Sequence, residues 1–142
     1  DWSSDVCSSD LGGESLKITV LGREAASGTR DGFESIFDCS EKCRYAAELS
    51  STGEVVTKVG SDKGSIGYVS LDSLNPSVKA LDVDGIKANE ENIISGKYQA
   101  QRTFIQIYKK GSDNELIKAW FDFVKSDEGR KVIKDVGLVN VK

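Results

Sequence analysis

Histidine is absent from this 142-residue sequence, and its absence excludes every mechanism that needs an imidazole. The chain has only three cysteines, and without histidine or a second cysteine pair no zinc site is expected. No apolar run approaches the roughly 18 residues that a membrane-spanning helix needs. At this length one compact domain is expected, and the 38% of apolar residues can supply its core.

A strong excess of either charge is also missing, because 19 basic residues face 23 acidic ones. The one basic cluster, Lys109-Lys110, is too small to follow a nucleic-acid backbone. We therefore expect no nucleic-acid partner.

Residues 1–11 resemble, residue for residue, one reading frame of a common sequencing adapter. We interpret the segment as read-through, expect it to be disordered, and exclude it from the fold prediction. Removing its three aspartates brings the net charge from −4 to about −1, and Cys7 is removed with them. On this interpretation the chain is a fragment, and an export signal or lipid anchor would lie in the missing N-terminal part.

Strand-like and helix-like apolar patterns alternate along the rest of the chain, which predicts an α/β architecture with a largely parallel sheet. Gly67 predicts a close backbone approach within its strand, and Asp84-Gly85 predicts a hairpin turn. We expect strands at residues 18–21, 45–49, 66–69, 78–83 and 103–108, the last carrying the strongest strand signal.

Helix boundaries are predicted from capping residues and glycines. Ser51 with Glu54 forms a capping box that opens a helix ending at Gly60. The aromatic residues Trp120, Phe121 and Phe123 are expected to pack in a core. We expect helices at residues 29–37, 51–60, 89–96, around 116–124, and around 132–137.

The turn between the first strand and the first helix carries the functional signal. A helix start exposes unpaired N–H groups and partial positive charge, both of which suit an anion. Ser27 and Thr29 add hydroxyls, Gly28 lets a ligand approach the backbone, and Arg23 offers a planar fork. Helix capping alone could also explain Ser27 and Gly28, although a cap needs no cation nearby. These residues predict a site for a tetrahedral oxyanion.

Arg23, Ser27, Gly28 and Thr29 form the pattern Arg-x-x-x-Ser-Gly-Thr before a helix. This pattern resembles the signature of the phosphate-binding proteins of bacterial phosphate-specific ABC transporters. In that family the Arg side chain, the two hydroxyls and nearby amides hold the phosphate. Some members orient the Arg with an Asp two residues later; here Ala25 stands there, so an orienting carboxylate must be Glu24 or lie elsewhere.

Further blocks of the chain resemble the same family, so the resemblance covers nearly everything from residue 16 to residue 142. It implies an α/β, periplasmic-binding-protein-like (type II) lobe, an incomplete one, with a mostly parallel sheet flanked by helices. Residues 12–101 would form a partial second lobe with the anion-binding turn. Residues 102–142 would be a return segment and C-terminal helices belonging partly to the first lobe, leaving Phe104, Trp120 or Phe123 partly uncovered.

The implied function is to bind inorganic phosphate outside the cytoplasm and deliver it to the membrane permease of an ABC transporter. The resemblance implies a monomer without cofactor or metal, located extracellularly, in the periplasm or anchored at the cell surface. Two alternatives stay open: an oxyanion-sensing or signalling module of the same fold, and a binder of another tetrahedral oxyanion such as sulfate. Phosphate keeps a proton that an acceptor can recognise, and the family's acceptor Asp lies in the other lobe.

Enzyme motifs are not found. The P-loop pattern G-x-x-x-x-G-K-[ST] is missing, and four residues rather than five separate Cys39 from Arg44, against a cysteine phosphatase. The carboxylates of Glu90 and Glu91 suit the first turn of a helix. We expect Cys39 and Cys43 to be incidental thiols, although a loop there would permit a local disulfide.

Overall fold

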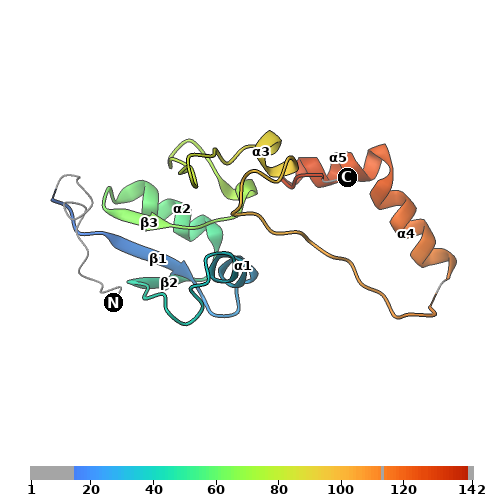
Figure 1. Ribbon diagram of the computed structural model, residues 1–142, viewed down its shortest axis with the longest axis horizontal. Coiled ribbons are helices and arrows are strands. Elements are labelled where there is room, and N and C mark those ends of the chain that lie inside the picture. Colours follow the sequence, from blue (N-terminus) through green and yellow to red (C-terminus); the bar gives the residue numbers. More distant parts are fainter. Residues whose placement is uncertain (1–14, 113, 141–142) are drawn as a thin grey trace.

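The computed structural model describes residues 15–112 and 114–140, so the disorder predicted for residues 1–11 lies outside the described residues. Strands and helices alternate through the first half of the chain, and the described part of the second half contains helices and extended segments but no strand (Figure 1). The elements are β1 Thr19–Arg23, α1 Gly28–Ile36, β2 Ala47–Leu49, α2 Thr52–Ser61, β3 Ser65–Gly67, a 3-10 turn Leu71–Ser73, α3 Glu90–Ile94, α4 Glu115–Lys125 and α5 Asp127–Asp135.

The three strands form one parallel sheet in the order β2-β1-β3, as the alternating pattern predicted. The buried core lies where α2 packs on this sheet, and consists of Leu21 from β1 with Val55 and Val56 from α2. The predicted close approach at Gly67 is confirmed, because a methyl group there would lie 2.8 Å from Val55 Cγ1. β1 extends to Arg23, so Arg23 ends the strand instead of standing in the turn.

The capping box of α2 is only half formed. Ser51 Oγ accepts from Glu54 N at 3.2 Å, but the Glu54 carboxylate accepts from Ser50 N at 3.0 Å and not from Ser51. The predicted stop at Gly60 is wrong, because α2 continues to Ser61. Gly60 instead gives room to a neighbouring loop, since a methyl group there would lie 3.3 Å from Ser77 Oγ.

The predicted strand at residues 78–83 is also wrong. Asp84 and Gly85 make the expected tight turn with positive φ angles of 52° and 75°. The turn closes a single bridge between Val83 and Ile86, with no ladder beyond it. Within the described ranges no strand lies beside this segment, so its alternating pattern has no sheet to join.

The strand predicted at residues 103–108 is not formed either. The segment runs as an extended chain between α3 and α4, away from the sheet (Figure 1). Phe104 is 70% exposed and Ile107 89%. A strand needs backbone partners along one edge, and no strand of the described chain lies along this segment.

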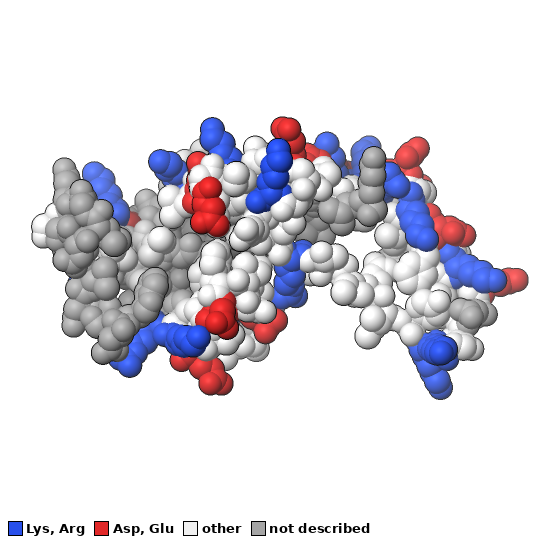
Figure 2. Space-filling model, in the orientation of Figure 1, with Lys and Arg blue, Asp and Glu red and all other residues white. Residues whose placement is uncertain are grey.

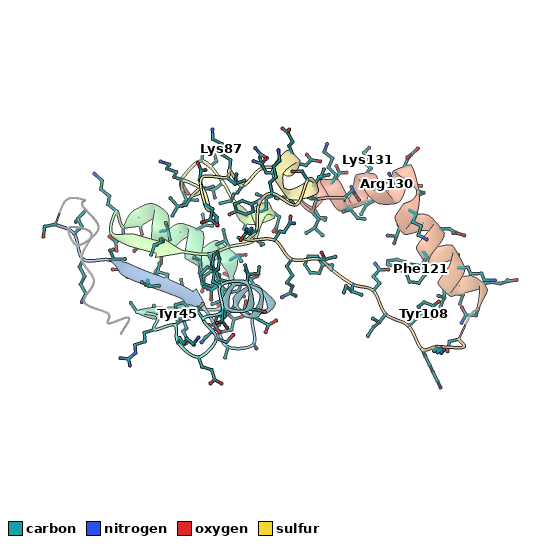
Figure 3. All side chains as sticks on the ribbon, in the orientation of Figure 1. Tyr45, Lys87, Tyr108, Phe121, Arg130 and Lys131 are labelled. Carbon is teal, nitrogen blue, oxygen red and sulfur yellow. The ribbon has the colours of Figure 1, made fainter. Side chains whose placement is uncertain are left out.

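The expected exposure of Phe104, Trp120 and Phe123 is confirmed, whereas the core role predicted for the α4 aromatic residues is wrong. Trp120 is 54% and Phe123 40% exposed, because α4 packs only on α5 among the elements described. Their rings lie 6.3 Å apart, and Tyr108 covers one side of Phe121 at 5.6 Å (Figure 3). Among residues 15–112 and 114–140, no helix has the length and apolar character to cross a membrane.

Candidate anion-binding site

The candidate site lies at the carboxyl edge of the sheet. β1 ends at Arg23 and β2 at Leu49, and because the strands are parallel both ends lie at the same edge. Each strand leads directly into a helix, so the starts of α1 and α2 come close to that edge, with α1 beside the arrowhead of β1 (Figure 1). Ligands of open α/β sheets bind at this edge.

The start of α1 offers both a cap and free donors. Ser27 is buried at 6% exposure and caps the helix, its Oγ accepting from Arg30 N at 3.4 Å. This bond uses the hydroxyl oxygen and leaves its hydrogen for another partner. The backbone N–H groups of Gly28 and Thr29 and the Thr29 hydroxyl have no hydrogen-bond partner in the described part of the chain.

Arg23 is held rigidly at the end of β1. Its Nε and Nη2 donate to the two Glu24 carboxylate oxygens at 3.1 and 2.8 Å. The same nitrogens donate to the carbonyls of Leu49 at 3.2 Å and Ser50 at 3.0 Å. The hydrogen bond that Arg23 donates to Glu24 raises the pKa of Arg23, and the side chain is only 12% exposed.

Glu24 is therefore the carboxylate that orients Arg23, one of the two possibilities that the sequence left open. The hydrogen bond from Arg23 lowers the pKa of Glu24, so the pair stays charged at neutral pH. Arg23 Nη1 has no hydrogen-bond partner among the described residues, which leaves one arm of the fork for a ligand.

Tyr68 holds the same strand end, and no sequence pattern indicated this contact. Its hydroxyl accepts from Arg23 N at 3.0 Å, and its ring stacks on Phe33 of α1 with centroids 4.2 Å apart. The strand end that carries Arg23 is thus held by the residue that follows β3, and that residue packs on α1.

Arg30, the second arginine of the motif region, uses its guanidinium in bonds within the fold. Its Nε donates to Glu34 at 2.7 Å, and its Nη1 donates to Glu48 at 2.9 Å and to the Arg23 carbonyl at 3.0 Å. Hydrogen bonding to Glu34 raises the pKa of Arg30. Glu34 also accepts from the Tyr45 hydroxyl at 3.0 Å, and burial raises the pKa of Tyr45.

Arg102 brings a further cation to the first turn of α1. Its Nη1 donates to the Gly28 carbonyl and lies 3.7 Å from Asp31 Oδ2. Gly32 makes room for this side chain, because a methyl group there would lie 3.0 Å from Arg102 Cδ. This contact joins positions 74 residues apart, so no local pattern could have indicated it.

Around the site the surface charge is mixed. Figure 2 shows basic and acidic side chains interspersed over the visible face, without an extended patch of either sign. In the described part of the chain no three His, Cys, Asp or Glu residues gather as metal ligands. The end of β1 and the start of α1 together offer one anchored guanidinium, two amides and two hydroxyls, and these groups can bind a compact anion.

Comparisons with known proteins agree on one family. Residues 1–128 match the family described as "PBP superfamily domain". The chain is 34% identical over 144 residues to phosphate-binding protein PstS 2 of Streptococcus agalactiae, covering 94% of this chain and 49% of that protein. It is 34% identical over 136 residues to phosphate-binding protein PstS of Bacillus subtilis, covering 93% and 44%. The chain thus spans about half the length of these curated relatives.

Solved structures show the same fold. An ABC-type phosphate transport receptor from Vibrio cholerae superposes with a TM-score of 0.83 at 29% identity, covering 94% of this chain and 57% of that one. A putative phosphate ABC transporter substrate-binding protein with bound phosphate, from Clostridium perfringens, gives 0.80 at 33% identity, covering 96% and 57%. The predicted α/β, periplasmic-binding-protein-like fold is confirmed.

Proposed function

This chain belongs to the PBP superfamily, and from that premise we propose that its protein binds inorganic phosphate through Arg23, Ser27, Gly28 and Thr29. The carrying observation is the anchored Arg23 fork at the sheet edge, where α1 presents two amides that have no partner among the described residues. The names of the relatives and the phosphate in the Clostridium perfringens structure support the same ligand.

Each proposed ligand has a distinct task. Arg23 Nη1 supplies the charge, with the other two guanidinium nitrogens holding it against Glu24 and the β2 end. The Gly28 and Thr29 amides and the Thr29 hydroxyl donate from the helix start, where the dipole favours an anion. Ser27 donates its hydroxyl hydrogen while its oxygen caps α1.

Selectivity for phosphate needs an acceptor for the proton that phosphate carries and sulfate lacks. Both Glu24 oxygens already accept from Arg23, and the four proposed ligands act as donors. We propose that the acceptor belongs to the first lobe of the fold. In this proposal residues 12–101 form part of the second lobe, and residues 102–142 are a return segment and C-terminal helices that belong partly to the first lobe.

The physiological role that we propose is delivery of phosphate to the membrane permease of an ABC transporter. This role places the protein outside the cytoplasm, as a monomeric binding protein without catalytic activity. The solved relatives are described as an ABC-type phosphate transport receptor and a putative phosphate ABC transporter substrate-binding protein, which supports this role. Because the proposed role is binding and delivery and not catalysis, we propose no cofactor.

Calorimetry on a protein containing this chain and the first lobe tests the proposal. Phosphate should bind with micromolar affinity, sulfate much more weakly, and Ser27→Ala should weaken the binding of phosphate. Ser126→Ala is the matched control, because Ser126 caps α5 through Gly129 N at 3.1 Å and α5 lies apart from α1 (Figure 1). Equal losses of phosphate affinity in both variants, or none in either, would show that Ser27 serves only as a cap.

A further inference from the structure

The loop that joins α1 to β2 brings two thiols together. Cys43 Sγ lies 3.1 Å from Cys39 Sγ, within hydrogen-bonding distance of that sulfur. Cys43 Sγ also lies 3.4 Å from the Cys39 carbonyl oxygen. Both cysteines are half-buried and free. The two sulfurs are therefore already in contact, without any bond between them.

The backbone of this loop is what makes the contact possible. The spacing of four residues suits a disulfide poorly inside a regular helix, but α1 ends at Ile36, before either cysteine. Cys39 N donates to the Glu34 carbonyl at 2.9 Å, and Lys42 N donates to the Cys39 carbonyl at 3.0 Å. These bonds fold the chain back on itself, so the two side chains meet within one turn.

We propose that Cys39 and Cys43 are a modification site, at which a low-molecular-weight disulfide oxidises the two thiols to an intramolecular disulfide. One cysteine thiolate attacks the reagent, forms a mixed disulfide and releases one reagent thiolate. The second cysteine attacks the mixed disulfide, forms the Cys39–Cys43 bond and releases the other. The protein loses two electrons to the reagent, and the two thiol protons pass to the released thiolates.

The environment of the pair assigns the order of these steps. Burial raises the pKa of the Cys39 thiol to about 11, so Cys39 stays protonated at neutral pH. We assign the first attack on the reagent to Cys43 and the closing step to Cys39. The contact between the two sulfurs favours the closing step even though the Cys39 thiol is a weak nucleophile at neutral pH. This order of steps relies on the contact between the two sulfurs and does not depend on phosphate binding at the start of α1.

The bond would fix the segment that leads into β2. Tyr45 follows two residues after Cys43, lies against Gly22 of β1 and donates to Glu34 of α1 (Figure 3). A closed ring at residues 39–43 would restrict this segment in the unfolded chain and so stabilise the folded one. The pair follows the end of α1, whereas Ser27 and Thr29 stand at its start, so we expect phosphate affinity to be unchanged.

The test uses the chain with Cys7→Ser, which removes the competing thiol, treated with oxidised glutathione at pH 8. Trypsin cuts after Arg30, Lys42 and Arg44, so it separates the two cysteines. We expect the dipeptide 43–44 to remain attached to peptide 31–42, with the intact protein lighter by two hydrogens. We also expect the melting temperature to rise by about 5 °C.

Cys43→Ser in the same background is the matched control, and should carry at most one glutathione and no cross-linked peptide. A parent protein that accumulates stable glutathione adducts on both cysteines, without the cross-link, overturns the proposal. Full alkylation of both thiols after prolonged exposure to oxidised glutathione overturns it as well.

Discussion

Replacing Arg23 tests the site where the structure is most specific. A charge-assisted hydrogen bond contributes about 1.5–3 kcal/mol, whereas a neutral hydroxyl contributes about 1 kcal/mol. In a protein containing this chain and the first lobe, Arg23→Ala should therefore weaken phosphate binding by about 10- to 150-fold. Ser27→Ala should cost less affinity, because Ser27 supplies one neutral bond in the proposed site.

Two further variants separate the charge of Arg23 from its geometry. Arg23→Lys restores the charge but cannot pair with Glu24 and both strand-end carbonyls while also reaching an anion, so it should recover only part of the affinity. Glu24→Gln removes the charged partner but leaves the Leu49 and Ser50 carbonyls in place. We expect it to weaken binding less than Arg23→Ala does.

The assay is calorimetric titration with phosphate, with thermal unfolding of each variant measured alongside. The unfolding curves are needed because the Arg23 side chain is only 12% exposed and ties β1 to the end of β2. A larger loss of phosphate affinity for Ser27→Ala than for Arg23→Ala, in folded proteins, would refute the assignment of Arg23 as the main ligand.

Three other predictions concern stability and reactivity. Deleting residues 1–11 should leave the melting temperature unchanged, and a fall of several degrees on the scale of about 1 kcal/mol would contradict the read-through interpretation. Gly67→Ala should lower the free energy of unfolding by about 1–3 kcal/mol in denaturant titrations, because the new methyl group would crowd Val55, and an unchanged midpoint would contradict that packing. Iodoacetamide should alkylate Cys39 in the reduced protein at a rate that keeps rising up to about pH 11. Because folding raises the pKa of this thiol, its contribution to the stability of the protein is complete below its ordinary pKa of 9.0 and is lost as the pH rises toward 11. A plateau in that rate near pH 9 would contradict the burial of Cys39.

Elements with local signals were predictable from the sequence. α1 and α2 begin one residue after Ser27 and Ser51, whose side chains make the capping bonds that the pattern indicated. Residues 103–108 carry the strongest strand propensity yet form no strand, because pairing depends on a distant edge that local propensity does not encode. Gly60 shows the same limit on a smaller scale, since contact with Ser77 decides its role.

The residues of the candidate site fall into the same two groups, those with a local sequence signal and those placed by distant contacts. Arg23, Ser27 and Thr29 were identified because strand, turn and helix follow one another in sequence, and Glu24 because it adjoins Arg23. The Leu49 and Ser50 carbonyls that hold Arg23 come from another strand, and chain carbonyls leave no trace in side-chain patterns. The contacts of Tyr68 and Arg102 span 45 and 74 positions, so only the fold reveals them.

A phosphate titration of this chain alone, followed residue by residue in amide NMR spectra, tests the central claim most directly. Micromolar affinity needs about 8 kcal/mol, whereas the turn offers four or five bonds, mostly of about 1 kcal/mol, and a helix-terminus contribution of about 0.3–1 kcal/mol. Water and salt reduce these further at an open site. We predict weak binding, with dissociation constants of about millimolar or above, and shifts centred on the Gly28 and Thr29 amides and on Arg23. Micromolar saturation, or shifts centred elsewhere in the chain, would contradict a phosphate site that begins at this turn and is completed by the first lobe.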